Sequence, residues 1–247
     1  MNFAWLAVFL ALAPVLPAVA TPGPVTDPEG LRFYSQGNYQ AAVQLYRQAL
    51  RGDPRNADLH YNLGNALFKS GQTGRAISSF QRAFDIRPRD ADIRQNLDFA
   101  LRRAGEELAP TGVPPLLFFT FHLLSERELA ALHWLACWLL LVLAGLYLWK
   151  ESLRPRLLSG TLAAGVLWSA FGAWWLAVRS GVSQQRGVIV ATSAEIRSGP
   201  GENFNVSFTA PEGRRLQIFS QEGDWLEIGV LKEGIKGWIP AAAIDPI

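Results

Sequence analysis

Residues 57–90 read ADLHYNLGNALFKSGQTGRAISSFQRAFDIRPRD, and this stretch decides most of the fold. Small residues at Gly64, Ala76 and Ala83 stand where two antiparallel helices must approach closely, and large apolar residues between them fill the remaining space. Pro88 ends the second helix, because proline lacks the amide hydrogen that a helix interior requires. The stretch therefore predicts a helix pair joined by a short turn.

The same spacing returns 34 residues earlier, so the helix pair is a tandem unit and not an accident of composition. The matching positions of the first copy are Gly30, Phe33, Gly37, Tyr39, Ala42, Tyr46, Ala49 and Pro54. Both copies resemble the tetratricopeptide repeat. Residues 91–97 resemble a further first helix without a partner helix, and we interpret them as a cap, which gives two repeats and a capping helix within 23–103. Such stacks usually need three repeats, so we expect support from a partner or from the rest of the chain.

The resemblance implies a concave face that binds a peptide or a partner helix. Its candidate contact residues lie on the first helix of the second repeat and on the cap, and they are Tyr61, Asn65, Phe68, Lys69, Gln95, Phe99 and Arg102. An alternative remains open in which the aromatic members only fill gaps between repeats. Family members that grip a terminal carboxylate carry Lys and Asn at set groove positions. Of these groove positions only Asn62 carries the matching residue in this chain, so we do not expect a ligand that is held by its terminal carboxylate.

The composition indicates several small parts with an apolar component. The chain has 247 residues, of which 49% are hydrophobic, and a formal net charge of +2. This charge is too small to indicate nucleic-acid binding, and the Arg residues of the repeats alternate with Asp and Glu as on a solvated helix surface. The single cysteine, Cys137, lies in an apolar run, which excludes a disulfide framework and a multi-cysteine metal site. We expect neither a cofactor nor a metal.

The first twenty residues indicate export. Residues 1–20 form a short apolar stretch that ends in Ala-Val-Ala, the small-x-small pattern that a signal peptidase recognises. No basic residue stands at its start, and Pro14 and Pro17 shorten its helix, so an uncleaved N-terminal anchor is the alternative to a signal peptide. Either outcome places the repeats outside the cytoplasm.

Two uncharged apolar runs occupy 129–149 and 157–178. Each has the roughly 20 residues that a helix needs to cross the hydrocarbon core. The loop between them, 150–156, contains Lys150, Arg154 and Arg156, and the positive-inside rule makes it cytoplasmic. Both soluble parts then face the periplasm. The spans predict an anchor in the inner membrane, because neither contains Asp, Glu, Lys or Arg and the one histidine, His133, is near an end, so a transport path has little support.

Residues 104–128 form a linker with an apolar centre. The segment 116–124 is too short to cross a bilayer and too apolar for water, so we expect it to lie in the bilayer interface. Ser125 and Glu128 have the Ser-x-x-Glu spacing of a capping box, which predicts that a helix begins there.

From 186 to 247 the pattern changes to short strands separated by turn residues, which is typical of a small barrel. The motifs that begin at Ile196 (IRSGPG), Trp225 (WLEI) and Gly237 (GWIP) resemble the bacterial SH3 (SH3b) domain.

This resemblance leaves the ligand-contacting residues open. Phe204, Trp225 and Trp238 are the candidates, although strand Trp side chains in so small a barrel are more often part of the core. We expect Gly199 and Gly201 to supply positive φ angles for a turn.

The predicted fold is multidomain, with an all-α tetratricopeptide helical repeat, a two-helix transmembrane hairpin and a small all-β SH3b barrel. This order of parts resembles the BatE family of the Bacteroides aerotolerance operons. The resemblance implies a membrane-anchored, periplasm-facing accessory protein that works beside von Willebrand A-type membrane proteins and a MoxR-type ATPase. The resemblance assigns no catalytic residue to this chain.

The leading hypothesis is a non-enzymatic scaffold that binds partner proteins through the repeat groove. The alternative is a cell-wall-tethering protein that binds peptidoglycan through its SH3b domain. An enzyme has the least support, because His60, His122 and His133 are dispersed and no nucleophile–base constellation, metal spacing or phosphate-binding loop is visible.

Overall fold

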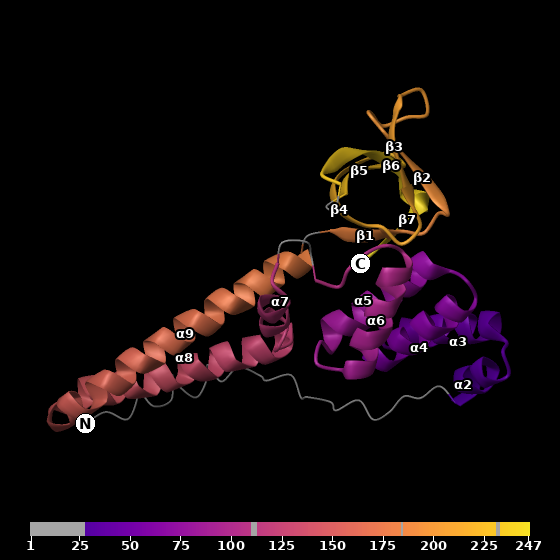
Figure 1. Cartoon of the computed structure of the whole chain (residues 1–247). Helices are drawn as coiled ribbons and strands as arrows, with labels where there is room; N and C mark the ends of the chain where they lie inside the picture. Colours follow the sequence, from indigo (N-terminus) through magenta and orange to yellow (C-terminus); the bar gives the residue numbers. More distant parts are fainter. Residues whose placement is uncertain (1–27, 110–112, 184, 231–232) are drawn as a thin grey trace.

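The computed structural model describes residues 28–109, 113–183, 185–230 and 233–247. The export segment expected at 1–20 lies outside the described residues. Within them the chain forms a helical repeat region, two long apolar helices and a C-terminal antiparallel β domain (Figure 1). The multidomain fold class predicted from the sequence is thereby confirmed.

The repeat region is built from antiparallel helices with side-chain caps. Asn38, Asn56 and Asp90 each accept a hydrogen bond from a backbone amide in the first turn of the helix that follows. Gly37 and Gly71 close the turns with positive φ, which glycine adopts without a Cβ clash. The helices are α2 (Pro28–Ser35), α3 (Tyr39–Gly52), α4 (Ala57–Lys69), α5 (Thr73–Ile86) and α6 (Ala91–Arg103).

Small and large residues interlock between α4 and α5, as the sequence predicts. A Cβ atom on Gly64 would stand 2.6 Å from the ring of Phe80, so the two helices can approach this closely only because the residue is glycine. Ala76 and Ala83 are fully buried in the same core. A bulkier residue at any of these positions would push the two helices apart.

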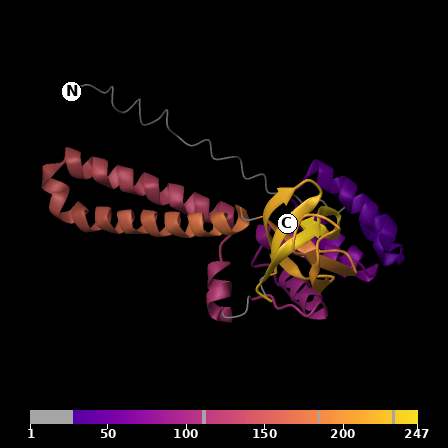
Figure 2. The same cartoon turned by 90° about the horizontal axis from the view of Figure 1, so that it is seen from above.

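Two long helices project away from the rest of the molecule (Figures 1 and 2). They are α8 (Glu126–Trp149) and α9 (Arg154–Ser183), joined by the short 3-10 turn η1 (Glu151–Leu153). Ser125 and Glu128 form the predicted capping box at the start of α8. By length and composition alone, both helices are long and apolar enough to cross a membrane.

A short helix, α7 (Pro115–Phe121), lies between the repeats and the hairpin. On one side the ring of Phe118 stacks on that of Phe84, with 6.4 Å between centroids. On the other side the Trp174 indole of α9 donates a hydrogen bond to a backbone carbonyl of α7 at 3.2 Å. Leu116 remains 78% exposed. The helix thus contacts both neighbouring parts and leaves apolar side chains uncovered.

The β domain is one antiparallel sheet that curls into a barrel (Figure 1). Its order is β3-β2-β6-β5-β4-β1-β7. The sequence indicated neither β3 nor β7. A short 3-10 turn, η2 (Ala241–Ala243), precedes the last strand. The strands are β1 (Arg186–Ile189), β2 (Ser193–Arg197), β3 (Val206–Pro211), β4 (Arg215–Glu222), β5 (Trp225–Val230), β6 (Ile235–Pro240) and β7 (Ile244–Pro246).

The β domain packs on α5, the second helix of the second repeat. Val188 of β1 is fully buried and belongs to the apolar core of the repeats. Arg82 of α5 donates to the Asp245 carboxylate of β7 at 2.7 Å, and Arg186 of β1 pairs with Asp85 of α5 at 2.9 Å. The two repeats therefore receive support from the rest of the chain.

Just after α6, the buried carboxylate of Glu106 forms ion pairs across the same interface. Glu106 is only 7% exposed, and it pairs with Arg214 at 2.9 Å and with Arg215 at 3.4 Å. Burial lowers the pKa of the Arg215 guanidinium, and the Glu106 charge opposes that effect. Arg214 also contacts Glu233 at 3.0 Å. The repeats and the β domain are thus joined by apolar packing and by charge pairs.

Candidate functional site

The groove residues Tyr61 and Asn65 lie on α4 and face α6. The Asn96 amide of α6 donates to the Tyr61 hydroxyl at 3.0 Å and to the Asn65 carbonyl oxygen at 2.9 Å. Asn96 was not among the expected groove residues, although it stands 34 positions after Asn62 and that spacing was visible in the sequence. Both predicted polar groups therefore already hold the repeat against its cap.

Phe68 and Phe99 form an aromatic pair at the same surface. Their rings are 5.5 Å apart in an edge-to-face arrangement, and the Arg103 guanidinium lies 5.4 Å from the Phe68 ring. Phe99 remains 59% exposed, so the contact with Phe68 covers only part of its side chain. Lys69 next to this pair is exposed. Phe99 and Lys69 are thus two of the expected groove residues that are exposed, together with Gln95 and Arg102.

Gln95 and Arg102 line an open groove of about 840 Å³ on the outer side of α6. Arg102 is paired with Asp98 on the same helix. Arg94 lies over the ring of Phe119, 5.4 Å from its centroid, and connects this groove to α7. The expected residues on the cap therefore lie beside the segment that leads to the hairpin.

The candidate residues Trp225 and Trp238 lie on the outer face of the barrel. Leu226 and Ile239, which alternate with them along β5 and β6, are buried in the barrel core. Both Trp side chains are half-buried. The alternative that they form the core is wrong, because alternation along a strand sends them to the opposite face.

The loop after β2 brings Phe204 and Arg197 together. The Arg197 guanidinium donates to the Phe204 carbonyl oxygen at 2.9 Å, and Arg197 pairs with Trp238 across the sheet. Phe204 is 40% exposed. Trp225 and Trp238 therefore share an outer face with Arg197, which the sequence did not single out, and the backbone of Phe204 lies beside Arg197.

The expected role of the two loop glycines is corrected. Neither Gly199 nor Gly201 has positive φ. A Cβ atom on Gly199 would stand 2.5 Å from the Phe204 ring, so this glycine makes room for the aromatic side chain. Close packing, and not a left-handed turn, explains the residue.

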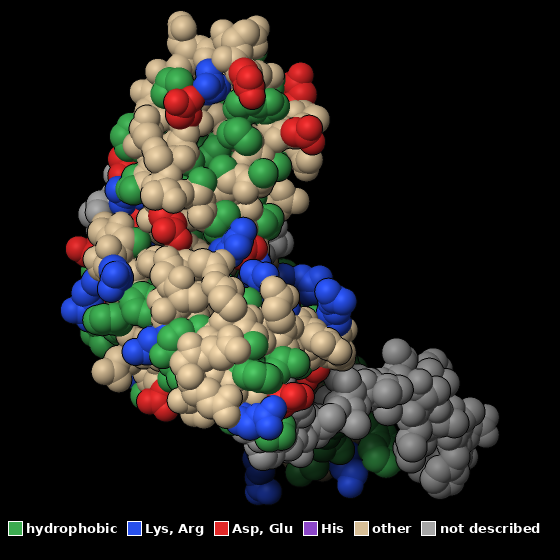
Figure 3. All heavy atoms as spheres, turned by 90° about the vertical axis from the view of Figure 1, so that its right-hand side faces the viewer, with side chains coloured by type: hydrophobic (Ala, Val, Ile, Leu, Met, Phe, Trp, Pro, Cys, Tyr) green, Lys and Arg blue, Asp and Glu red, His purple; other side chains and the backbone are tan. Residues whose placement is uncertain are grey.

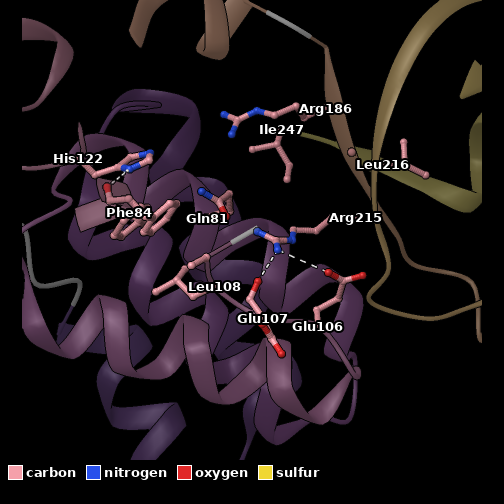
Figure 4. A pocket seen from close by; sticks show the side chains of 13 residues that line it. Gln81, Phe84, Glu106, Glu107, Leu108, His122, Arg186, Arg215, Leu216 and Ile247 are labelled. Carbon is pink, nitrogen blue, oxygen red and sulfur yellow. Dashed lines mark hydrogen bonds and ion pairs between the residues drawn. The ribbon is translucent and has the colours of Figure 1, made fainter. Parts of the chain in front are cut away.

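A cavity of about 360 Å³ lies between the repeats, α7 and the β domain (Figure 4). Phe84, Leu108 and Leu216 make its walls apolar. Its two guanidinium groups belong to Arg186 and Arg215, and each is paired with a carboxylate of the repeat region. The carboxylate of Glu107, which also lines the cavity, is exposed and forms no ion pair within the described residues.

The three histidines lie on separate parts of the described chain. In the part of the chain that the structure describes, no three His, Cys, Asp or Glu side chains come together as metal ligands would. His60 lies on α4, His122 follows α7 and His133 lies on α8, so the three histidines are not brought together. Cys137 is half-buried within α8.

Comparison with known proteins agrees with this architecture. Residues 30–71 match the family described as TPR repeat, and residues 57–90 match the tetratricopeptide repeat family. Residues 192–245 match the family described as bacterial SH3 domain. The chain carries tetratricopeptide repeats and a bacterial SH3 domain. Both are typically binding modules without catalytic residues.

Among curated proteins, the chain is similar to one named as N-acetylmuramoyl-L-alanine amidase YrvJ of Bacillus subtilis (strain 168). The two are 35% identical over 57 residues, which is 23% of this chain and 11% of the amidase. The similarity concerns only the SH3 domain. This chain thus spans about a tenth of the length of that relative.

Solved structures of MamA are also similar to part of the chain. Two MamA mutants are 29% identical and have a TM-score of 0.30. Each match covers 31% of this chain, together with 42% of one structure and 56% of the other. MamA MSR-1 C2 is 28% identical over 31% of this chain and 44% of its own, with a TM-score of 0.29.

Proposed function

We propose that this protein is a non-enzymatic scaffold, anchored in the bacterial inner membrane, that binds partner proteins through its repeat groove. The observation that carries the proposal is the exposed aromatic Phe99 beside Lys69, on a repeat face that the SH3 domain leaves uncovered. Among the described residues, no hydrogen bond or ion pair between the repeats and the SH3 domain involves a predicted groove residue.

The binding parts also share one end of the hairpin. Arg89 of the repeats pairs with Glu128 at the start of α8, and Glu126 lies within 3.9 Å of Arg179 at the end of α9. If α8 and α9 cross the bilayer, the repeats and the SH3 domain are held at the same membrane surface. With the basic loop 150–156 in the cytoplasm, that surface is periplasmic.

The resemblance to BatE supplies the proposed setting. A periplasmic scaffold of this design would serve membrane proteins of the von Willebrand A type in a system with a MoxR-type ATPase. The mixed surface of Phe99, Lys69 and Arg103 suits a partner segment that combines apolar and acidic side chains.

Capture from native membranes tests this function. The full chain, cross-linked and purified, is compared with a variant carrying Phe99→Ala and Lys69→Ala. These positions are preferable to Tyr61 and Asn65, because the latter support the repeat itself. Phe219→Ala removes a comparably exposed ring from the SH3 domain and serves as control. Partners lost from the groove variant and kept by the control support the scaffold, and identical captures from all three proteins contradict it.

A second function rests on the outer face of the SH3 domain. Trp225 and Trp238 lie there half-buried, Phe204 is exposed in the loop after β2, and the similarity to a cell-wall amidase concerns this domain. The protein would then tether the membrane to peptidoglycan. Sedimentation of the full chain with purified peptidoglycan tests this, with Trp238→Ala expected to weaken it. The full chain is needed, because the first strand of the domain is part of the repeat core.

A further inference from the structure

Helix α7 exposes apolar side chains that take no part in its contact with the repeats. Phe118 faces the repeats, where its ring stacks on that of Phe84. Leu116 and Leu117 lie outside that contact and are 78% and 61% exposed. The segment 113–124 contains no Asp, Glu, Lys or Arg. On the side of the molecule away from the hairpin, charged side chains of both signs are spread over the surface (Figure 3). The exposed side of α7 differs from that solvated surface.

The polar groups of α7 also need few hydrogen bonds from water. Pro115, the first residue of the helix, has no amide hydrogen and so adds no free donor to the first turn. The Thr120 hydroxyl donates to the Leu116 carbonyl oxygen at 2.7 Å. At the other end, the Phe121 carbonyl oxygen accepts a hydrogen bond from the Trp174 indole of α9 at 3.2 Å. Such internal partners are what a helix needs where lipid replaces water.

The contact with α9 gives the level of α7 along the hairpin. Trp174 lies inside the apolar run 157–178, and Arg179 is the first charged residue after that run. With a rise of about 1.5 Å per residue, the distance from Trp174 to Arg179 along the helix axis is about 7 Å. Helix α7 lies across the direction of the hairpin (Figure 2). If α8 and α9 cross the bilayer, the end of α7 therefore lies just inside the membrane surface.

Arginine side chains stand at the same end of the hairpin. Arg55 of the repeats and Arg179 of α9 lie 3.8 Å and 3.9 Å from the carboxylate of Glu126. One carboxylate thus faces two guanidinium groups, which leaves an excess of positive charge. Arg127 beside it is exposed and forms no ion pair within the described residues. Cationic groups at this level suit the phosphates of lipid headgroups.

We infer that α7 lies in the outer half of the lipid bilayer, with Leu116 and Leu117 among the acyl chains, and that it thereby holds the repeats against the membrane. This placement rests on the proposed anchoring of the hairpin. Phe118 connects α7 to the repeats, so a helix fixed in lipid also fixes the orientation of the repeat groove. A bilayer suits this face better than a partner protein, because α7 contacts the apolar run of α9 and lies beside arginines that suit lipid phosphates.

Spin labels on the full chain test the inference in nanodiscs of phosphatidylethanolamine and phosphatidylglycerol, with Cys137 replaced by Ala. Labels introduced by Leu116→Cys or Leu117→Cys should be more accessible to oxygen than to a water-soluble nickel complex. Their depth should be about 5–10 Å below the lipid phosphates. The matched control is Phe219→Cys, an exposed apolar position of the SH3 domain, where the nickel complex should have the better access. Val142→Cys, exposed on α8, reports on the hairpin itself and should lie deepest.

The label on the hairpin separates failure of the inference from failure of the anchor. Water-accessible labels at positions 116 and 117, with position 142 in lipid, would overturn the inference and leave the anchor in place. A water-accessible label at position 142 would contradict the anchor and the inference together. Labels at 116 and 117 that neither oxygen nor the nickel complex reaches would show that protein covers α7, which also contradicts the bilayer as its partner.

Discussion

Replacing Glu106 with Gln should loosen the SH3 domain from the repeats. The substitution keeps the shape of the side chain and removes the charge that faces Arg214 and Arg215. Loss of one partner from a buried ion pair costs about 3–5 kcal/mol. Arg214 keeps Glu233, and Arg215 keeps a backbone carbonyl, so we expect a smaller loss of roughly 2–3 kcal/mol in the free energy of unfolding.

The effect is measured by thermal unfolding of the full chain in detergent micelles. For a protein of this size, 1 kcal/mol corresponds to about 2–4 °C, so the transition that includes the SH3 domain should move down by roughly 5–10 °C. Glu107→Gln is the matched control, because it removes the same charge one position away, where the side chain is exposed and forms no ion pair within the described residues. If both variants unfold within about a degree of each other, Glu106 does not fasten the interface and the reasoning is wrong.

The remaining predictions concern the repeats and the hairpin. Gly64→Ala should destabilise the repeats by about 1–3 kcal/mol, because the added methyl group would stand 2.6 Å from a phenyl ring of α5. A lowered urea midpoint of unfolding checks this prediction. Gly52→Ala is the neutral control, because its added methyl group meets open space. Stability should fall as the pH drops below about 6.5, since the lowered pKa of His60 lets the unfolded chain bind the extra proton. Urea midpoints at pH 7.5 and 5.5 measure this, and a variant with His122→Gln should show the same loss. A reporter enzyme that is active only in the cytoplasm should be active when it is fused after Glu151. Activity of a reporter that works only in the periplasm, fused at the same position, would contradict the proposed topology.

The elements that could be predicted from the sequence are those set by local spacing. Gly64 and Pro88 fix a helix pair through contacts within one repeat, and Ser125 caps the helix that follows it. The strand β7 has only three residues and follows a 3-10 turn, so its pattern is too short to distinguish from a loop. Gly199 shows the same limit, because glycine permits both a left-handed turn and a close ring contact.

The contact between the repeats and the SH3 domain could not be predicted, because it joins residues far apart in the chain. Arg82 and Asp245 are 163 positions apart, and in the sequence Arg82 is one more charge on a solvated helix. Glu106 falls in a linker that carries no periodic signal. The faces of Trp225 and Trp238 were also ambiguous, since alternation fixes which residues share a face but not which face is inside. Only the tertiary structure decides these questions.

The central claim is that the repeat groove binds a partner protein at the membrane surface, and a photo-crosslinking amino acid at position 99 tests it most directly. Irradiation of cells that carry this variant should join the chain to one or a few discrete proteins. The same probe at the exposed position Phe219 of the SH3 domain should not capture them. Crosslinks from position 99 only to cell-wall fragments, or none while a probe at Trp238 captures wall material, would contradict the scaffold and favour tethering through the SH3 domain.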